Sequence, residues 1–503
     1  MKELTKELEK KYNDLFEERK RAILEAKDEL VIKGTTYYVS NDGDDANDGK
    51  APQTSWKTLD KVSCADLKKG DGVLFKRGDL FRGMVITCQG VSYGAYGEGK
   101  KPEFYGSEMA LADPDLWEEY DKEHHIWKCR KQLLDSGTLV FNDGEAHSRK
   151  LIPTYKNLQF VCRDDESRIF KMEDEMTEDL DLYWHFDMYL TRKPSRGEDF
   201  PIPYVTEDNY EESHGDLYLR CDRGNPGEVF DSIESVARTH MFVVGTNEGV
   251  TIDNVCIKYV GMHGVAGREH VSNLTITNCE MGWIGGSIQN YFGNDPNFKE
   301  GGRGTVTRFG NAIEIYGGCD NYTAADNYIY EVYDAGITHQ ITTSSKITMT
   351  NIRYTGNVIE KCVYGIEYFL EQIDGECESY MDDVVMEDNF IRLSGYGWGQ
   401  QRHNQHTPAL IKGWSYTNTA RNYKICNNIF DRSAYRMLHL VALKDEYCPE
   451  MYGNTFIQDL GGMIGQYGGN EADEPEIVMF DDNAEETINT VFGDTSAEVY
   501  CIK

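Results

Sequence analysis

Apolar and polar residues alternate in short runs along most of the chain, and this period of two predicts β-strands. The first thirty residues differ, because apolar residues recur there every three to four positions among charged ones, at Leu4, Leu8, Tyr12, Leu15, Phe16, Ile23 and Leu24. That spacing predicts an amphipathic helix within residues 1–34. We expect the helix to pack over the end of the main domain; a helix that joins subunits into a homo-oligomer is the alternative.

From about residue 236 onward, a short segment recurs in which an asparagine precedes alternating apolar residues. The asparagines are spaced 24, 49, 30, 32, 39 and 26 residues apart, at Asn254, Asn278, Asn327, Asn357, Asn389, Asn428 and Asn454. A unit of two or three short strands cannot bury its own apolar face, whereas stacked units share one core. The repeat therefore predicts a right-handed parallel β-helix in which each asparagine bonds to the coils above and below. A β-propeller, with four antiparallel strands per blade, is the main alternative.

The remaining segments complete the predicted domain organisation. Residues 35–110 carry short strand patterns between glycines, which indicate the first part of the β-helix. Residues 111–235 are irregular and rich in Trp, Tyr and acidic residues, and they predict an inserted β-sandwich-like domain. Residues 236–503 would hold the main β-helix, its catalytic coils and a C-terminal cap. The fold class is thus all-β, with an N-terminal α-helix added.

The formal net charge of −34 bears on the partners of the chain. Such a field repels nucleic acid and anionic membranes, so we expect neither as a partner. It also disfavours a polyanionic substrate, unless the site is locally basic or holds a cation. No run of about 18 apolar residues occurs, and the charged N-terminal segment lacks the apolar core of a signal peptide. We therefore expect a cytoplasmic protein.

The cysteines and histidines give no strong metal signal. Thirteen cysteines are scattered without a CxxC pair, which favours free buried thiols in a reducing compartment. His403 and His406 lie three residues apart, but no third ligand is evident. The Asp-rich turn near Asp42 lacks the spacing of a helix-loop-helix calcium site, and calcium binding there is left open. We expect no cofactor and no metal in the active site.

Three repeat segments, FGNAIEIYGG, DAGITHQ and VYGIEYFLE, align on the glycine that follows each Asn repeat, so that Ala312-Ile313 matches Gly336-Ile337 and Gly365-Ile366. The isoleucines point into the core, so the next residue of each segment points outward, and equivalent positions stack about 4.8 Å apart in successive coils. One outward column then contains Glu314, Thr338 and Glu367. The other contains Tyr316, Gln340 and Phe369. Asp334 lies just upstream on the middle coil, where the chain turns into the sheet.

Three carboxylates on three successive coils, at positions 314, 334 and 367, suit the hydrolysis of a glycosidic bond. Like charges this close raise at least one pKa, as a general acid requires. Carboxylates on neighbouring coils, about 5 Å apart, favour retention, and those two coils apart, about 9–10 Å, approach the inverting range. Asp334 precedes Thr338 by four residues, about 13 Å along a straight strand, so only a bend at the turn brings it to the column.

Aromatic and polar residues nearby could bind a sugar ring. Tyr316, Tyr368, Phe369, Tyr396 and Trp398 could form a platform, and the long insertion at 399–414 could close one side of the site. His339 alternates inward and is either a hydrogen-bonded core histidine or a substrate contact. The predicted substrate-binding residues are Tyr316, Thr338, His339, Gln340, Tyr368, Trp398, Gln401, Arg402 and His403.

Several motifs carry a resemblance to a known family. In order they are SNDGDDANDG, TSWKTL, GDGVLFKRGDLFRG, GNPGEVFDSIE, WIGGS, RFGNAIEIYGG, VYDAGITHQ and VYGIEYF. They resemble β-helix glycoside hydrolases of the β-xylosidase type, in which a β-sandwich interrupts a parallel β-helix, and the likeness covers most of residues 35–460. It implies a retaining mechanism with Asp334 as nucleophile, Glu367 as acid/base and Glu314 as a third active-site acid. The charged N-terminal helix lies outside the resemblance.

Three hypotheses about function follow. The first is an exo-acting glycoside hydrolase that releases a sugar, with xylose suggested by the resemblance, from short oligosaccharides. The second is a polysaccharide lyase or uronate epimerase on the same fold, although the outward columns carry acids and neutral groups and Arg402 is the only basic candidate nearby. The third is a non-catalytic carbohydrate-binding β-helix, which predicts that the carboxylates are ordinary surface groups.

Overall fold

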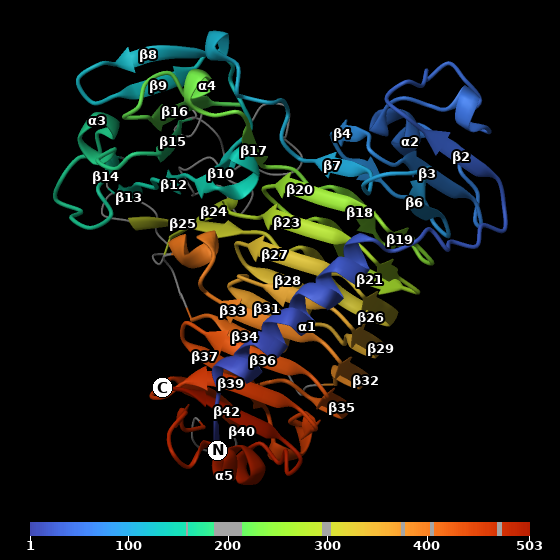
Figure 1. Ribbon diagram of the computed structural model, residues 1–503, viewed down its shortest axis with the longest axis vertical. Coiled ribbons are helices and arrows are strands. Elements are labelled where there is room, and N and C mark those ends of the chain that lie inside the picture. The colour runs from blue at the N-terminus through green and yellow to red at the C-terminus, as the bar shows by residue number, and fades with distance from the viewer. Residues whose placement is uncertain (157–158, 186–213, 294–302, 374–377, 403–406, 470–474) are drawn as a thin grey trace.

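The computed structural model describes residues 1–156, 159–185, 214–293, 303–373, 378–402, 407–469 and 475–503. The chain winds into a tall stack of coils, with a second lobe beside the upper end of the stack (Figure 1). Each coil contributes strands to three ladders, and within each ladder successive coils pair in parallel. The protein is therefore mostly β, and parallel pairing between coils excludes the β-propeller. The right hand of the coil stays a prediction.

The first ladder forms one face of the stack. Its strands pair in the order β17 (Ile233–Ala237), β20 (Cys256–Val260), β23 (Glu280–Ile284), β27 (Tyr328–Val332), β30 (Val358–Glu360), β33 (Phe390–Ser394), β36 (Ile429–Ser433), β39 (Thr455–Asp459) and β42 (Glu498–Ile502). From the N-terminal segment, β4 (Leu80–Arg82) and β7 (Glu103–Tyr105) join it beside β20.

The second ladder carries the predicted columns. It contains β5 (Val85–Ile86), β18 (Phe242–Gly245), β21 (Val265–Ser272), the first half of β26 (Ile313–Ala325), β28 (Ala335–Thr343), β31 (Tyr364–Gln372), β34 (Ala409–Gly413), β37 (Arg436–Ala442) and β40 (Met463–Gly469), with the short antiparallel β41 (Val478–Met479) at its end.

The third ladder starts with the N-terminal coils and closes each turn. It runs through β2 (Thr36–Val39), β3 (Gly72–Lys76), β6 (Ser92–Tyr96), β19 (Thr251–Asp253), β22 (Thr275–Thr277), the second half of β26, β29 (Thr348–Thr355), β32 (Tyr380–Glu387), β35 (Ala420–Cys426) and β38 (Glu450–Tyr452).

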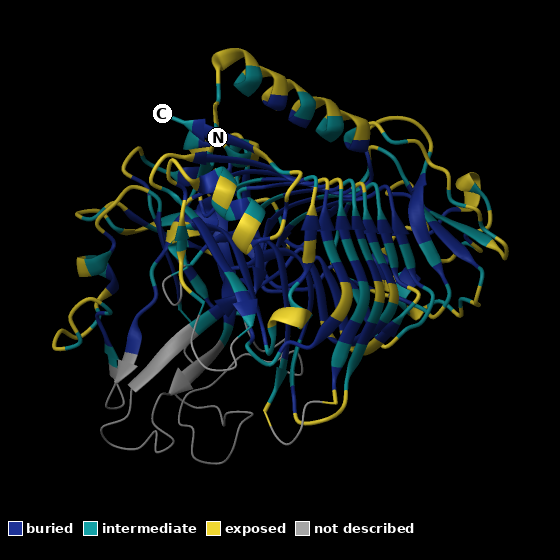
Figure 2. Cartoon of the chain, turned by 90° about the horizontal axis from the view of Figure 1, so that it is seen from below, coloured by how far each residue is buried: buried dark blue, intermediate teal, exposed yellow. Residues whose placement is uncertain are grey.

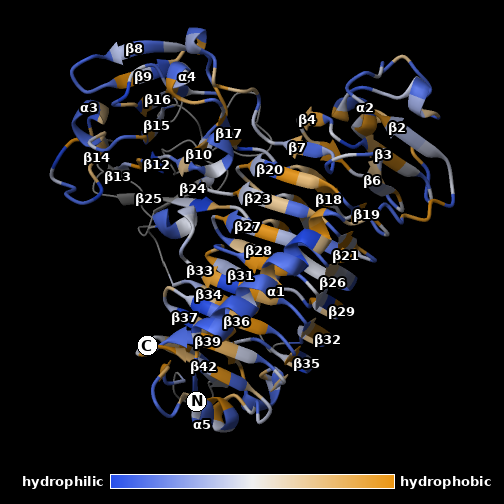
Figure 3. Ribbon diagram, in the orientation of Figure 1, coloured by the Kyte–Doolittle hydropathy of each residue, from blue (hydrophilic) through white to orange (hydrophobic). Residues whose placement is uncertain are grey.

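One apolar core fills the space between the ladders. Figure 2 shows buried strands throughout the stack, and Figure 3 shows the apolar segments along the same strands. Isoleucines from successive coils stack in this core, and Ile313, Ile337 and Ile366 are all fully buried. Each such side chain contributes roughly 1.5–3 kcal/mol by leaving water, so the stack is stable only when its coils bury one another.

An asparagine ladder runs along one corner of the stack. The Asn357 backbone N–H and Nδ2 donate to Asn389 Oδ1 at 3.0 and 2.9 Å, and the same pattern repeats between coils. The ladder contains Asn327, Asn357, Asn389, Asn428 and Asn454 and ends on the Asp494 carboxylate. These five are buried, as the repeat predicted.

Two of the seven repeat asparagines do not belong to this ladder, and their predicted equivalence is wrong by one residue. Asn254 and Asn278 have left-handed backbones with φ of 62° and 53°, the position that Asp326 holds in the coil of Asn327. Cys279 takes the ladder position instead, and its backbone N–H donates to Asn327 Oδ1 at 3.0 Å. Asparagine is favoured at both positions, because it tolerates a positive φ and also bonds to backbone groups.

Helix α1 (Lys6–Leu24) lies along the first ladder rather than over an end of the stack (Figure 2). Thr5 caps it, since the Thr5 hydroxyl accepts the Leu8 N–H at 3.3 Å. Its apolar face buries Tyr12, Phe16 and Ile23, and the Phe16 ring packs edge-on against Phe390 with centroids 5.1 Å apart. The chain end before it, β1 (Lys2–Glu3), pairs with β42 and covers the last coil.

The second lobe is built mainly from the predicted insertion. One sheet contains β8 (Trp117–Asp121), β9 (Ile126–Cys129), β16 (Asp216–Arg220), β15 (Asp181–His185) and β12 (Arg149–Lys150). A second sheet pairs β13 (Thr154–Lys156) and β14 (Gln159–Val161) with a hairpin from the main stack, β24 (Ser287–Gly293) and β25 (Arg303–Phe309). The antiparallel strand β10 (Ser136–Phe141) joins the lobe to the stack by pairing with β17, and β11 (Ala146–His147) follows it.

Short helices fill the remaining turns. They are α2 (Leu59–Cys64), α3 (Met172–Glu175), α4 (Pro226–Val229) and α5 (Ala484–Val491). None of the helices in the described part of the chain has the length and apolar character needed to span a bilayer. The twelve cysteines in the described part are free thiols, and most are buried.

Candidate active site

The outer face of the second ladder brings the predicted columns together. Ile337 pairs with both Ile313 and Ile366, and Thr338 pairs with Glu367. Tyr316, Gln340 and Phe369 are in register in the same way. The alignment of the three segments on their isoleucines therefore gave the correct register. The column that contains Glu314 continues beyond Glu367 through Lys412, His439 and Gln466.

Glu314 is buried, with 6% of its surface exposed, and is surrounded by hydrogen-bond donors. Its Oε2 accepts from Asn311 Nδ2 at 2.6 Å, the Thr338 hydroxyl at 2.7 Å and Gln340 Nε2 at 2.9 Å. Burial raises the pKa of Glu314 to about 7; the three donors oppose that rise, and the nearby Glu367 carboxylate adds to it. Glu314 can therefore hold or release a proton near neutral pH.

Glu367 is as buried as Glu314 but has a charged partner. Lys412 Nζ lies 2.9 Å from Glu367 Oε1, on the next coil. Burial raises the pKa of Glu367, the Lys412 ammonium opposes that rise, and the Asp334 carboxylate reinforces it. Burial lowers the pKa of Lys412, but the interactions with Glu367 and Tyr364 together raise it above its ordinary value.

Asp334 reaches the same site from the turn before β28. Its carboxylate is buried and forms an ion pair with the Arg402 guanidinium, which comes from the insertion that follows β33. Arg402, the partner of Asp334, and Lys412, the partner of Glu367, lie 5.4 and 3.9 Å from the centre of the same Tyr364 ring. The turn therefore brings Asp334 toward the column that holds Glu367. The Arg402 pKa is raised by Asp334 despite the opposing effect of burial.

Two predicted substrate-binding residues instead lie inside the coil. His339 is fully buried; its Nδ1 lies 2.8 Å from the Tyr354 hydroxyl and its Nε2 lies 3.2 Å from the Tyr423 hydroxyl. Tyr368 stacks on the His339 ring at 5.5 Å and belongs to the same core. Burial lowers the pKa of His339 to about 3. Both rings point away from the outer face because successive residues of a strand alternate, so a substrate on that face does not meet them.

Of the other predicted substrate-binding residues, some lie at the carboxylates and others pack in the structure around them. Thr338 and Gln340 hold Glu314, and Tyr316 is 39% exposed on the outer face. Trp398 is buried against Tyr333, and its Nε1 donates to the Glu331 carbonyl at 2.7 Å. Gln401 bonds to the Lys150 N–H and the Ser148 carbonyl and so ties the insertion to the second lobe. His403, and with it His406, lies outside the described residues.

An aromatic stripe runs beside the carboxylates. The Phe369 ring lies 6.5 Å from Tyr316 on one side and 4.4 Å from Trp414 on the other, between ring centroids. The predicted Tyr396 is exposed and makes no ring contact with this stripe among the described residues. Apolar ring faces next to carboxylates are suited to the C–H faces of a sugar.

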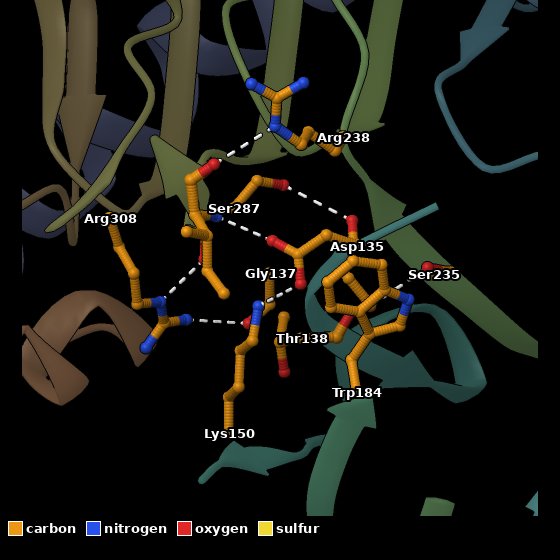
Figure 4. A network of polar contacts seen from close by, with 12 residues as sticks. Asp135, Gly137, Thr138, Lys150, Trp184, Ser235, Arg238, Ser287 and Arg308 are labelled. Atoms are coloured by element: carbon orange, nitrogen blue, oxygen red, sulfur yellow. Dashed lines mark hydrogen bonds and ion pairs between the residues drawn. The ribbon is translucent and has the colours of Figure 1, made fainter. Parts of the chain in front are cut away.

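A buried polar network lies behind the site, where the lobe meets the stack (Figure 4). Asp135 forms an ion pair with Lys150 and accepts the Ile288 N–H at 2.6 Å. Arg308 donates to the Gly286 and Gly137 carbonyls at 2.6 and 2.7 Å. Its guanidinium lies 4.4 Å from the ring of Tyr333, the residue directly before Asp334. The network thus anchors the turn that presents Asp334.

Sequence reasoning missed several residues of the site. Asn311 and Lys412 contact the carboxylates directly, and Arg436 and His439 lie farther along the same face. Extending the alignment to later coils would have found Lys412, because ALIKG repeats the strand pattern of YGIEY. A possible group of metal ligands, Cys162, Asp164 and Glu175, lies in the second lobe, but Arg168 already contacts both carboxylates.

Comparison with known proteins gives only partial likenesses. No protein-family model matches the chain. Over 56 residues, 10% of its length, the chain is 51% identical to a lacto-N-biosidase of Bifidobacterium longum subsp. longum, and the match spans only 4% of that protein.

Two solved structures align over most of the chain. A GH136 lacto-N-biosidase from Eubacterium ramulus aligns over 99% of this chain and 70% of its own, with 14% identity and a TM-score of 0.35. XylC in complex with xylose aligns over 93% of this chain and 83% of its own, with 10% identity and a TM-score of 0.41. TM-scores at this level do not establish a shared function.

Proposed function

We propose that this protein is a glycoside hydrolase that removes a terminal sugar from short oligosaccharides by a retaining, two-carboxylate mechanism on a right-handed β-helix. The observation that carries the proposal is the meeting of three buried carboxylates, Glu314, Asp334 and Glu367, on successive coils of one outer face. Acidic residues are rarely buried unless they are paired, and clusters of buried acids with shifted pKa values are typical of functional sites. The short match to a lacto-N-biosidase agrees with a glycosidase.

Each carboxylate takes a role suited to its surroundings. Asp334 would attack the anomeric carbon, with Arg402 holding its carboxylate in place. Glu367, whose pKa is raised by burial, would protonate the leaving oxygen and then activate water for the second step. Glu314, held by Thr338 and Gln340, would accept hydrogen bonds from sugar hydroxyls.

Retention of configuration requires Asp334 and Glu367 to approach one another across neighbouring coils. Glu367 pairs with Thr338, four residues after Asp334, so the proposal depends on the bend that turns Asp334 toward the column. Carboxyl groups about 5–5.5 Å apart leave no room for a water between the sugar and the nucleophile. An attack by Asp334 would therefore form a covalent glycosyl-enzyme, which water then hydrolyses.

The experiment is the hydrolysis of nitrophenyl xyloside, arabinoside, glucoside, galactoside and fucoside by the wild type, Asp334→Ala and Glu367→Ala. We expect release of one sugar by the wild type and a loss of kcat/KM of more than about a thousandfold, about 4 kcal/mol, in both variants. Glu371→Ala on the same strand β31 is the matched control and should remain active.

Azide distinguishes the nucleophile from the acid/base residue. Added azide should restore turnover in both variants, giving a glycosyl azide of inverted configuration with Asp334→Ala and of retained configuration with Glu367→Ala. If Asp334→Ala still cleaves the glycoside, the catalytic pair would be Glu314 and Glu367. These two lie two coils apart, a separation that favours inversion. Absence of cleavage of every glycoside would reject the proposal.

A lyase is the second candidate, because two cations, Arg402 and Lys412, stand among the carboxylates. A lyase needs a base that removes the proton next to a sugar carboxylate. The raised pKa of Lys412 keeps its ammonium protonated and makes it a poor base. An ultraviolet-absorbing unsaturated product from an oligouronide would favour this candidate over hydrolysis.

A further inference from the structure

Arg436 is a buried cation on the outer face of the second ladder, and it has no carboxylate partner among the residues that the structure describes. It begins β37, two coils beyond β31, and only 7% of its surface is exposed. Its Nη1 donates to Gln466 Oε1 at 2.6 Å, while its Nε has no hydrogen-bond partner. Within the part of the chain that the structure describes, no aspartate or glutamate forms an ion pair with it.

The two cations next to the carboxylates are paired. Arg402 contacts Asp334, and Lys412 contacts Glu367. Both have a raised pKa, whereas burial lowers the pKa of Arg436 and no carboxylate of the described residues compensates. Removing a charge from water without a counter-charge is strongly unfavourable, so an unpaired guanidinium is expected where a ligand supplies the anion.

Neighbouring polar groups complete a binding position around Arg436. His439 lies next to Lys412 and Gln466 in the column, is 9% exposed, and has no hydrogen-bond partner at Nδ1. Burial, helped by the charges of Arg436 and Lys412, lowers the pKa of His439 to about 3, so its ring is neutral. Gln466 Nε2 donates to the Pro475 carbonyl at 2.9 Å, which fixes the amide that Arg436 contacts.

Cations gather near the carboxylates in a chain that has 86 acidic and 52 basic residues. Lys412 Nζ lies 3.9 Å from the centre of the Tyr364 ring, and Arg402 lies 5.4 Å from it on the same face. Arg402, Lys412 and Arg436 thus share this face with Glu314, Asp334 and Glu367, and Arg436 is the cation of the three that forms no ion pair within the described residues. These cations offset, at the site, the repulsion that the net charge exerts on an acidic substrate.

We propose that Arg436, with His439 beside it, binds the anionic group of an acidic sugar, such as the carboxylate of a uronic acid, in the oligosaccharide held at the carboxylates. This inference rests on the proposed function and narrows its substrate class to acidic oligosaccharides. Two coils separate Arg436 from the level of Glu367, about 10 Å along the stack, roughly the length of two sugar units. The acidic sugar would therefore lie beyond the bond that is cleaved.

The test measures binding rather than turnover, by calorimetry with three probes: methyl glucuronoside, methyl glucoside and methyl glucoside 6-sulfate. We expect the wild type to bind an anionic probe at least tenfold more tightly than methyl glucoside. Arg436→Gln should remove that preference and leave glucoside binding unchanged. Arg421→Gln, an exposed arginine paired with Asp382 on the third ladder, is the matched control and should change neither.

The choice of anionic probe identifies the group, since a preference for the sulfate ester alone would assign a sulfated sugar. Arg436→Lys keeps the charge and should retain part of the preference, which covers the case in which Arg436→Gln does not fold. Equal binding of all three probes by the wild type, or a preference that survives in folded Arg436→Gln, overturns the inference.

The two proposals fail separately. Release of a neutral sugar together with equal probe binding would leave the hydrolase standing and remove the acidic substrate. Anion binding that depends on Arg436, without cleavage of any glycoside, would leave the binding position standing and reject the hydrolase.

Discussion

At the scale of single residues, surroundings rather than identity separate the three carboxylates. Glu314 faces only neutral donors, Glu367 faces an ammonium, and Asp334 faces a guanidinium. Burial alone raises the pKa of a carboxyl, and a charged partner opposes that rise. Carboxyl groups on one face can thus serve as a proton donor or as a nucleophile.

Glu314→Gln should stabilise the protein at alkaline pH. The pKa of Glu314 in the folded protein, about 7, lies above its ordinary value of 4.5, so the folded state holds the proton more tightly. The stability that this proton provides is complete below pH 4.5 and is lost as the pH rises through 7, by roughly 3 kcal/mol. The gain from Glu314→Gln should therefore be larger at about pH 8 than at about pH 5, as a shift in the urea midpoint.

Glu371→Gln, at the partly exposed end of β31, is the control and should shift the urea midpoint little at either pH. A gain from Glu314→Gln that is equal at both pH values would mean that Glu314 does not change its protonation between them.

At the scale of elements, the asparagine ladder joins each coil to the next by side-chain bonds that run along the stack. Asn389 Nδ2 donates to the Tyr354 carbonyl and to Asn428 Oδ1, both at 2.9 Å, while Asn389 Oδ1 accepts from Asn357. Every partner is buried, so a missing side chain leaves several polar groups unsatisfied at once.

Asn389→Ala should destabilise the protein by about 2–4 kcal/mol, because at least two buried groups lose their hydrogen bonds. The urea midpoint measures the loss, and hydrogen exchange should show faster opening of β30 and β33. Asn13→Ala, at an exposed position of α1, should change stability by less than about 0.5 kcal/mol. A similar small effect at Asn389 would show that the ladder bonds do not contribute to stability.

At the scale of the whole molecule, the chain carries a net charge of −34 and yet concentrates cations on the face that holds the carboxylates. The excess of acidic residues lies elsewhere and repels itself when the chain is compact. We therefore expect the distribution of charge, rather than the net charge, to decide which substrates the site binds.

The melting temperature should rise by several degrees between about 0.02 M and about 0.5 M sodium chloride. The Debye length falls from roughly 20 Å to roughly 4 Å over this range, so repulsion among the surface carboxylates is screened. Choline chloride should have the same effect, which separates ionic strength from binding of sodium. A melting temperature that falls with salt would mean that attractive ion pairs outweigh the repulsion.

The sequence by itself determined the β-class of the protein, the stacking of repeated units and the register of the columns. Period-two alternation and the repeated Asn and Gly-Ile positions are local signals, because each depends on residues within one coil. The inward direction of His339 was also readable from alternation. Its partners, Tyr354 and Tyr423, come from other coils and could not be identified from alternation.

Only the tertiary structure decided which side chains meet across coils and across insertions. The pairing of Asp334 with Arg402 depends on an insertion 68 residues away in sequence, and that of Glu367 with Lys412 depends on the length of the segment between their strands. The predicted equivalence of Asn278 with the ladder asparagines was wrong by one residue, because two adjacent turn positions favour the same amino acid. Packing, which alternation does not encode, placed α1 along the first ladder and left Arg436 without a carboxylate partner within the described part of the chain.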